Sequence, residues 1–138
     1  MQRRQTETEV LPVCRRYGLG LTTYSPLAIG LLSGRFRRGE PVPDTAFWTE
    51  EQLQARLSER GERVVRTLVE LARDGRATPA QLAIAWLLDH PEVTAPIVGA
   101  DRPEYVDDVF GALSIELTPE ERRALDGVSQ WDEPGRYL

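Results

Sequence analysis

Two short segments hold the residue types of this chain that are best suited to bind a ligand. The first runs from Thr23 to Arg35 and the second from Pro96 to Asp108. Each begins with apolar and β-branched residues, and each continues into glycine, hydroxyl and charged residues. The pattern predicts a strand whose carboxyl end opens into a turn. Loops at the carboxyl ends of parallel strands are where α/β folds bind ligands, so both segments are candidate binding loops.

Some catalytic side chains are missing from the sequence. It contains no lysine, so all seventeen basic side chains are arginines, and His90 is its single histidine. Chemistry that needs a lysine and a histidine in one site is therefore excluded for this chain alone. Because His90 directly precedes Pro91, we expect it to be a surface or helix-end residue rather than a general base.

Composition narrows the class of protein and of partner. A chain of 138 residues with 41% hydrophobic and 28% charged residues is typical of one globular domain. Its net charge of −5 argues against a nucleic-acid partner, since phosphate binding requires a basic face. The arginines alternate with acidic residues, which favours solvated helix surfaces.

Three further expectations concern the cellular setting. Cys14 is the only cysteine, which rules out an internal disulfide or a thiolate metal site, and we expect it to be buried. No apolar run approaches the roughly 20 residues of a membrane span. The first residues are polar and charged rather than a secretory signal, so a cytoplasmic location is expected.

The elements that must position the candidate loops are mostly helices. Threonine followed three residues later by Gln or Glu predicts helix starts at Thr49, Thr78 and Thr118. The first of these helices is expected to break near Gly61. Helices are predicted over 7–16, 49–72, 78–90, 103–113 and 118–128, strands over 19–24 and 93–98, a long loop over 34–47 and an irregular arm over 129–138.

The two predicted strands are separated by helices and therefore read as parallel neighbours. The strand over 19–24 is apolar or β-branched on both faces, as expected for a parallel strand that is covered on both sides. Two strands alone leave both sheet edges unpaired. The chain therefore reads as part of a larger fold.

The order of motifs resembles the C-terminal two-fifths of an aldo-keto reductase. The resemblance extends from Arg4 to Ser129, and six motifs in the same order and spacing support it. They are Arg4-x-x-Glu7-x-Glu9-Val10-Leu11-Pro12, Tyr17-Gly18-Leu19-Gly20, Tyr24-Ser25-Pro26-Leu27-Ala28-x-Gly30-Leu31-Leu32-Ser33-Gly34-Arg35, Thr78-Pro79-Ala80-Gln81-Leu82-Ala83-Ile84-Ala85-Trp86, Ile97-Val98-Gly99-Ala100 and Leu117-Thr118-Pro119-Glu120-Glu121.

The resemblance implies an α/β fold, namely the C-terminal portion of a (β/α)8 TIM barrel. The two strands would be the seventh and eighth, with flanking helices, in a helix-rich incomplete barrel. Residues 1–138 would form a single partial domain. Members of this family reduce aldehydes and ketones with NADPH through an aspartate, tyrosine, lysine and histidine tetrad. All four come from earlier strands, so no catalytic residue is assigned here.

The resemblance does imply a binding site for NADP(H) and no metal site. The residues after the first strand would line the nicotinamide and pyrophosphate path, and Arg35 would contact the pyrophosphate. Residues after the second strand would meet the adenosine 2′-phosphate at a helix start, or the adenine. The implied cofactor-binding residues are Tyr24, Ser25, Pro26, Leu27, Arg35, Gly99, Ala100, Asp101, Tyr105 and Asp108.

Three positions depart from the family pattern. Asp101 stands where serine or a basic residue is usual, and its carboxylate would repel a 2′-phosphate. Ala46 replaces an arginine that usually follows the proline-rich loop, and Val109 replaces a frequent asparagine. We therefore expect a weakened preference for NADPH over NADH.

Two further readings remain open at the level of sequence. The chain could be a non-catalytic half-barrel that binds a nucleotide or a protein through open strand edges, which would favour self-association or capture of a complementing N-terminal half. The helices around residues 78–91 could also imitate a helix-turn-helix, although the acidic balance and the intervening strand argue against DNA binding. In a complete enzyme, the partners would be the dinucleotide and a small carbonyl compound.

Overall fold

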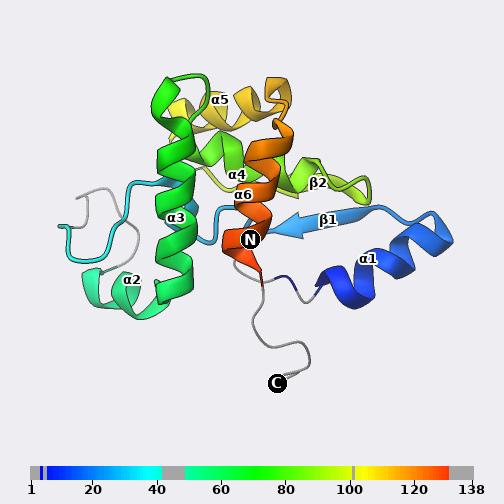
Figure 1. The fold of residues 1–138 in the computed structure, drawn as a ribbon, viewed down its shortest axis with the longest axis horizontal. Coiled ribbons are helices and arrows are strands. Elements are labelled where there is room, and N and C mark those ends of the chain that lie inside the picture. Colours follow the sequence, from blue (N-terminus) through cyan, green and yellow to red (C-terminus); the bar gives the residue numbers. More distant parts are fainter. Residues whose placement is uncertain (1–3, 5, 42–48, 101, 131–138) are drawn as a thin grey trace.

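The computed structural model describes residues 4, 6–41, 49–100 and 102–130 (Figure 1). The predicted arm over 131–138, the end of the loop over 34–47, Ala46 and Asp101 lie outside these residues. In chain order the elements are α1 Thr6–Tyr17, β1 Leu21–Tyr24, η1 Leu31–Ser33, α2 Glu50–Arg56, α3 Glu59–Leu71, η2 Ala72–Asp74, α4 Pro79–Leu88, β2 Val93–Ile97, α5 Pro103–Gly111, η3 Ala112–Ser114 and α6 Pro119–Ser129.

Capping boxes define the starts of α2, α4 and α6, as the sequence predicted. In each box a threonine side chain accepts a hydrogen bond from the backbone N–H three residues later, and that residue's side chain accepts one from the threonine N–H. The pairs are Thr49–Gln52, Thr78–Gln81 and Thr118–Glu121. Burial opposes ionisation of Glu121, but hydrogen bonds from Thr118 and from Arg76 together lower the pKa of this carboxyl.

The break expected near Gly61 lies instead at Leu57 and Ser58, so that prediction was wrong. The Ser58 side chain accepts a hydrogen bond from the Gly61 N–H and begins α3. Gly61 is buried inside the first turn of this helix. A glycine at that position gives its N–H to the cap and does not interrupt the helix.

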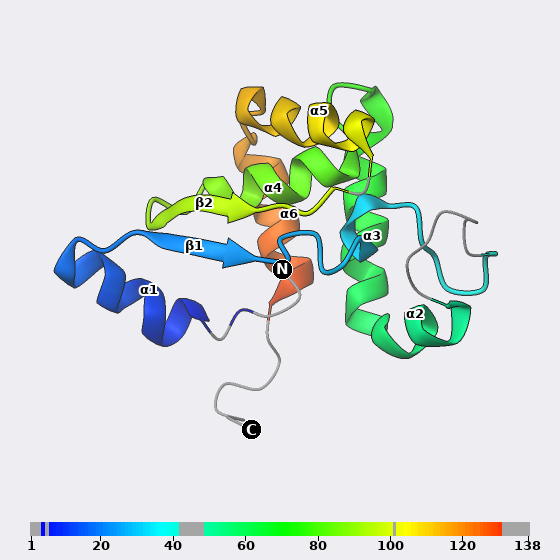
Figure 2. The same ribbon diagram turned by 180° about the vertical axis from the view of Figure 1, so that it is seen from behind.

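The sheet consists of β1 and β2 in parallel, with Thr22 beside Ala95 and Tyr24 beside Ile97. These four residues are exposed, whereas their neighbours along each strand are more buried. Helix α4 contacts β2 on the covered face, and Figure 2 shows no helix over the opposite face. The expectation that β1 is covered on both sides is thus wrong for the described residues, because they supply only one helical layer.

The core lies between α3, α4 and α6. Leu68, Leu82 and Leu125, one from each helix, are completely buried. Helices α3 and α6 run side by side in both views, and α4 lies between them and the sheet (Figures 1 and 2). Helix α4 is almost wholly apolar and buried, as predicted. This helix therefore connects the sheet to the rest of the molecule.

Arg4 and Trp86 join three distant parts of the chain. The Arg4 guanidinium donates to both carboxylate oxygens of Glu7 at 2.7 Å and to the Asp126 carbonyl at 2.9 Å. It also lies 5.2 Å from the centre of the Trp86 ring. The Trp86 indole N–H donates to the Asp126 carboxylate at 3.0 Å, and His90 contacts the indole edge-on. The segment before α1 is thereby attached to α4 and α6.

Two helices carry apolar side chains without partners in the described residues. The exposed side chains repeat at helical spacing along one side of α1 and along one side of α5 with η3. They are Val10, Val13 and Tyr17 on the first, and Val106, Phe110 and Leu113 on the second. Cys14, on the other side of α1, is buried as expected. No helix of the described residues is long and apolar enough to cross a membrane.

Candidate functional site

The two predicted binding loops begin at the same edge of the sheet. Because β1 and β2 are parallel and Tyr24 pairs with Ile97, Ser25 and Gly99 both follow the paired carboxyl ends. The predicted convergence of the two segments is therefore confirmed (Figure 2). Tyr24 itself is 85% exposed, so its ring is available to a ligand.

The backbone after β1 adopts an unusual conformation. Ser25, Ala28 and Ile29 have φ values of 50°, 49° and 57°, in the left-handed region that non-glycine residues seldom occupy. The turn is closed by hydrogen bonds from the Ala28 N–H to the Ser25 carbonyl at 2.9 Å and from the Gly30 N–H to the Leu27 carbonyl at 3.0 Å. Such strain concentrates at functional sites, because surrounding structure must hold it in place.

Ile29 offers a direct test of this strain. We expect Ile29→Asn to raise the free energy of unfolding by about 1 kcal/mol, because asparagine tolerates the left-handed region that a β-branched residue resists. Urea unfolding followed by circular dichroism measures the change. Val106→Asn is the control, since Val106 is similarly exposed (42% against 37%) but lies in helix α5. An equal response of the two variants would contradict the assignment of strain to Ile29.

Arg35 and Tyr105 come together although seventy residues separate them. The Arg35 Nη1 donates a hydrogen bond to the Tyr105 hydroxyl, and its guanidinium carbon lies 4.3 Å from the centre of the Tyr105 ring. Its Nε donates to the Ser33 hydroxyl at 3.3 Å. Within the described residues Arg35 has no carboxylate partner, so its charge is held by neutral groups. The arrangement suits recognition of an anion.

Ser33 is a site residue that the sequence reasoning did not assign. Its hydroxyl donates to the Gly30 carbonyl at 2.7 Å and accepts from Arg35, so it connects the strained turn to the cation. The signal was present, because Ser33 lies between Leu32 and Gly34 in the motif quoted above. A hydroxyl two residues before an arginine was simply not weighed.

Asp108 lies on the same helix as Tyr105 but makes structural contacts. Its carboxylate accepts from the Thr78 hydroxyl at 3.0 Å, and its carbonyl accepts from the Gln81 side chain at 2.9 Å. Both partners belong to the capped start of α4. Asp108 therefore anchors α5 to α4, and any role toward a ligand would be additional.

The remaining predicted site residues occupy the two loops in different ways. Pro26 is half-buried, and Leu27 packs against the core and fixes the first loop. Gly99 and Ala100 are exposed, and a side-chain carbon added at Gly99 would meet no atom within 4 Å. The backbone of the second loop is thus open to close approach. Asp101 lies outside the described residues.

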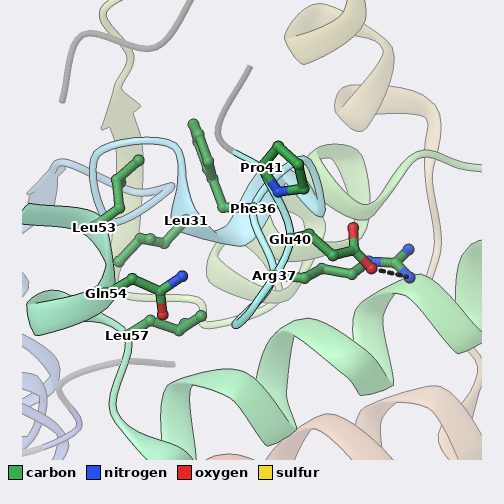
Figure 3. A pocket seen from close by; sticks show the side chains of 8 residues that line it. All are labelled: Leu31, Phe36, Arg37, Glu40, Pro41, Leu53, Gln54 and Leu57. Atoms are coloured by element: carbon green, nitrogen blue, oxygen red, sulfur yellow. Dashed lines mark ion pairs between the residues drawn. The ribbon is translucent and has the colours of Figure 1, made fainter. Parts of the chain in front are cut away.

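A separate groove lies beside the first loop, between its end and helix α2 (Figure 3). Its volume of about 10 Å³ is close to what one water molecule needs, so it is too small for a cofactor. Figure 3 also shows the ion pair between Arg37 and Glu40 at its rim. The groove is lined by Leu31, Phe36, Arg37, Glu40, Pro41, Leu53, Gln54 and Leu57.

Comparison with known proteins gives one consistent family. The model of the aldo/keto reductase family matches residues 1–130. The chain is 31% identical over 122 residues to a probable aldo-keto reductase 1 of Glycine max, covering 88% of this chain and 35% of that protein. It is 38% identical over 133 residues to a probable voltage-gated potassium channel subunit beta of Oryza sativa subsp. japonica, covering 93% of this chain and 40% of that protein.

A solved structure gives the same result for the fold. A thermostable aldo-keto reductase, crystallised with the inhibitor epalrestat, superposes with a TM-score of 0.62 at 29% identity. The match covers 92% of this chain and 36% of that structure. The chain thus spans 35–40% of the length of these relatives. Its two strands and surrounding helices form part of a TIM barrel, as the motifs predicted.

Proposed function

Because the chain belongs to the aldo/keto reductase family, we propose that it supplies the NADP(H)-binding edge of an enzyme that reduces aldehydes or ketones to alcohols. The observation that carries the proposal is the pairing of Arg35 and Tyr105 between the two loops that follow β1 and β2. A cation held by hydroxyl groups at the carboxyl edge of a parallel sheet suits a dinucleotide phosphate.

The residues present fit this cofactor. Two of the five N–H donors of Arg35 are engaged by Ser33 and Tyr105, which leaves three for phosphate oxygens. The exposed backbone at Gly99 allows a phosphate to approach, and the exposed Tyr24 ring can pack against a planar group. When bound, NADPH supplies the hydride. The part of this chain is to hold and orient the dinucleotide.

Proton donation is assigned to groups outside this chain. The sequence contains no lysine, and the ring of its only histidine, His90, packs edge-on against Trp86 on the core helix α4. His90 is thereby placed as a structural residue. We therefore expect the purified chain to bind NADPH without reducing carbonyl compounds.

Two assays on the purified chain test the proposal. The quench of NADPH fluorescence or calorimetry should show saturable binding that Arg35→Ala weakens about tenfold, the loss expected for one charge-assisted contact. Arg73→Ala is the matched control, because Arg73 is an exposed arginine on the distant η2 turn. Absent binding, or equal losses in both variants, would refute the proposed site. Oxidation of NADPH by an aldehyde in the presence of the chain alone would refute the assignment of proton donation.

Cofactor preference should depend on Asp101. We expect Asp101→Ser to tighten NADPH binding roughly fivefold and to leave NADH nearly unchanged, because the carboxylate repels only the cofactor that carries a 2′-phosphate. Parallel titrations with the two dinucleotides measure the difference. Equal gains for both would show that the carboxylate acts elsewhere.

A second candidate function is a non-catalytic binding module, and the exposed apolar residues favour it. The open face of the sheet and the sides of α1 and α5 expose Tyr24, Ile97, Val13 and Phe110 among others. Because unpaired strand edges and apolar patches promote association, we expect the chain to elute at increasing apparent mass as its concentration rises. A monomer at all concentrations in size-exclusion chromatography with light scattering would contradict this expectation.

A further inference from the structure

The start of helix α4 supports both partners of the Arg35–Tyr105 pair. On one side, Pro79 lies so close to Gly34 that a side-chain carbon there would come within 2.9 Å of its ring. On the other side, Thr78 and Gln81 hold α5 through Asp108. Arg35 follows Gly34 directly, and Tyr105 lies in the first turn of α5. One capped helix start therefore fixes the separation of the two side chains.

The contact between the two side chains uses the whole tyrosine. The hydroxyl accepts a hydrogen bond from Nη1, and the ring face lies 4.3 Å from the guanidinium carbon. A cation over an aromatic face is stabilised by the ring quadrupole, and the hydrogen bond fixes its rotation. Arginine otherwise has many rotamers to lose on binding an anion. Holding it beforehand lowers that entropic cost.

From these contacts we propose that Tyr105 is a positioning residue for dinucleotide binding, acting through Arg35 rather than by its own contact with the adenine. The inference rests on the proposed NADP(H) function and concerns the phosphate-binding part of that site. It changes the role that family resemblance implied for this position. The tyrosine orients the guanidinium so that its remaining N–H donors face the ligand, and its substitution weakens phosphate recognition.

Three probes separate the two roles of Tyr105. NADPH carries both phosphates and adenine, inorganic pyrophosphate carries only phosphates, and adenosine carries only the base and ribose. If Tyr105 acts through Arg35, its loss weakens the first two and spares adenosine. If it stacks on adenine, its loss weakens NADPH and adenosine and spares pyrophosphate.

The experiment is a calorimetric titration of the whole chain with each probe, in the wild type, Tyr105→Phe, Tyr105→Ala, Arg35→Ala and the double variant. We expect Tyr105→Ala to weaken NADPH and pyrophosphate about tenfold and Tyr105→Phe about threefold, because phenylalanine keeps the ring and loses the hydroxyl. In the Arg35→Ala background, Tyr105→Ala should have no further effect. Phe110→Ala, an exposed residue farther along α5, is the control and should bind as the wild type does.

Each outcome decides one claim. Additive losses in the double variant, a selective loss of adenosine binding, or tighter NADPH binding by Tyr105→Ala would overturn the positioning role while leaving the proposed function standing. A wild-type chain that binds neither NADPH nor pyrophosphate would instead overturn the proposed function, and the positioning role with it. Circular dichroism of each variant shows that the fold is retained.

Discussion

Trp86→Ala is expected to lower the free energy of unfolding by about 3–5 kcal/mol, as for other large buried aromatic side chains. The side chain is only 3% exposed and lies on the helix that connects the sheet to α3 and α6. Its removal leaves a cavity and also deprives Arg4 and Asp126 of a partner. Urea unfolding followed by far-ultraviolet circular dichroism measures the loss.

Trp86→Phe separates packing from hydrogen bonding at this position. Phenylalanine keeps an aromatic face for Arg4 but cannot donate to the Asp126 carboxylate, so we expect a loss of about 1–2 kcal/mol. A loss below about 1 kcal/mol for the alanine variant would show that the junction between α4, α6 and the segment before α1 contributes little to stability.

Gly34→Ala should be the most damaging small substitution near the candidate site. Gly34 has a φ of 76°, and an added side-chain carbon would lie 2.9 Å from Pro79 and 3.0 Å from Val69. We expect a loss of about 2–4 kcal/mol, from left-handed strain together with the overlap. Because the loop must move away from α4 to relieve the overlap, the variant should also weaken NADPH binding.

Gly75→Ala is a matched control for this prediction. Its φ of 75° is nearly identical, but no atom lies within 4 Å of the added carbon. Only the backbone strain remains, so we expect a loss of about 1 kcal/mol and unchanged NADPH binding. Equal destabilisation of the two variants would mean that the close approach of the loop to α4 contributes nothing.

Local signals predicted much of the fold. The boxes at Thr49, Thr78 and Thr118 correctly placed three helix starts, because a cap and its partner are only three residues apart. The helix break was misplaced because Gly61 was weighed as a breaker and Ser58 was not weighed as a cap. The uncovered face of β1 had no local signal, since its coverage depends on segments distant in sequence or outside the chain.

The candidate site was predictable only in outline. Parallel strands bring their carboxyl ends together, so the proximity of Ser25 and Gly99 followed from the pattern. The contact of Arg35 with Tyr105 did not, because it depends on how α4 supports two elements from opposite sides. The left-handed conformation of Ile29 was equally hidden, since turn rules assign that conformation to glycine or asparagine.

The central claim is that the loops after β1 and β2 hold the dinucleotide, and amide NMR spectra of the labelled chain during titration with NADPH test it most directly. We expect saturable shifts at Ser25, Leu27, Arg35, Gly99 and Tyr105, with little change along α3. Shifts confined to the groove around Phe36 and Leu53, or no shifts at all in a folded chain, would contradict the claim.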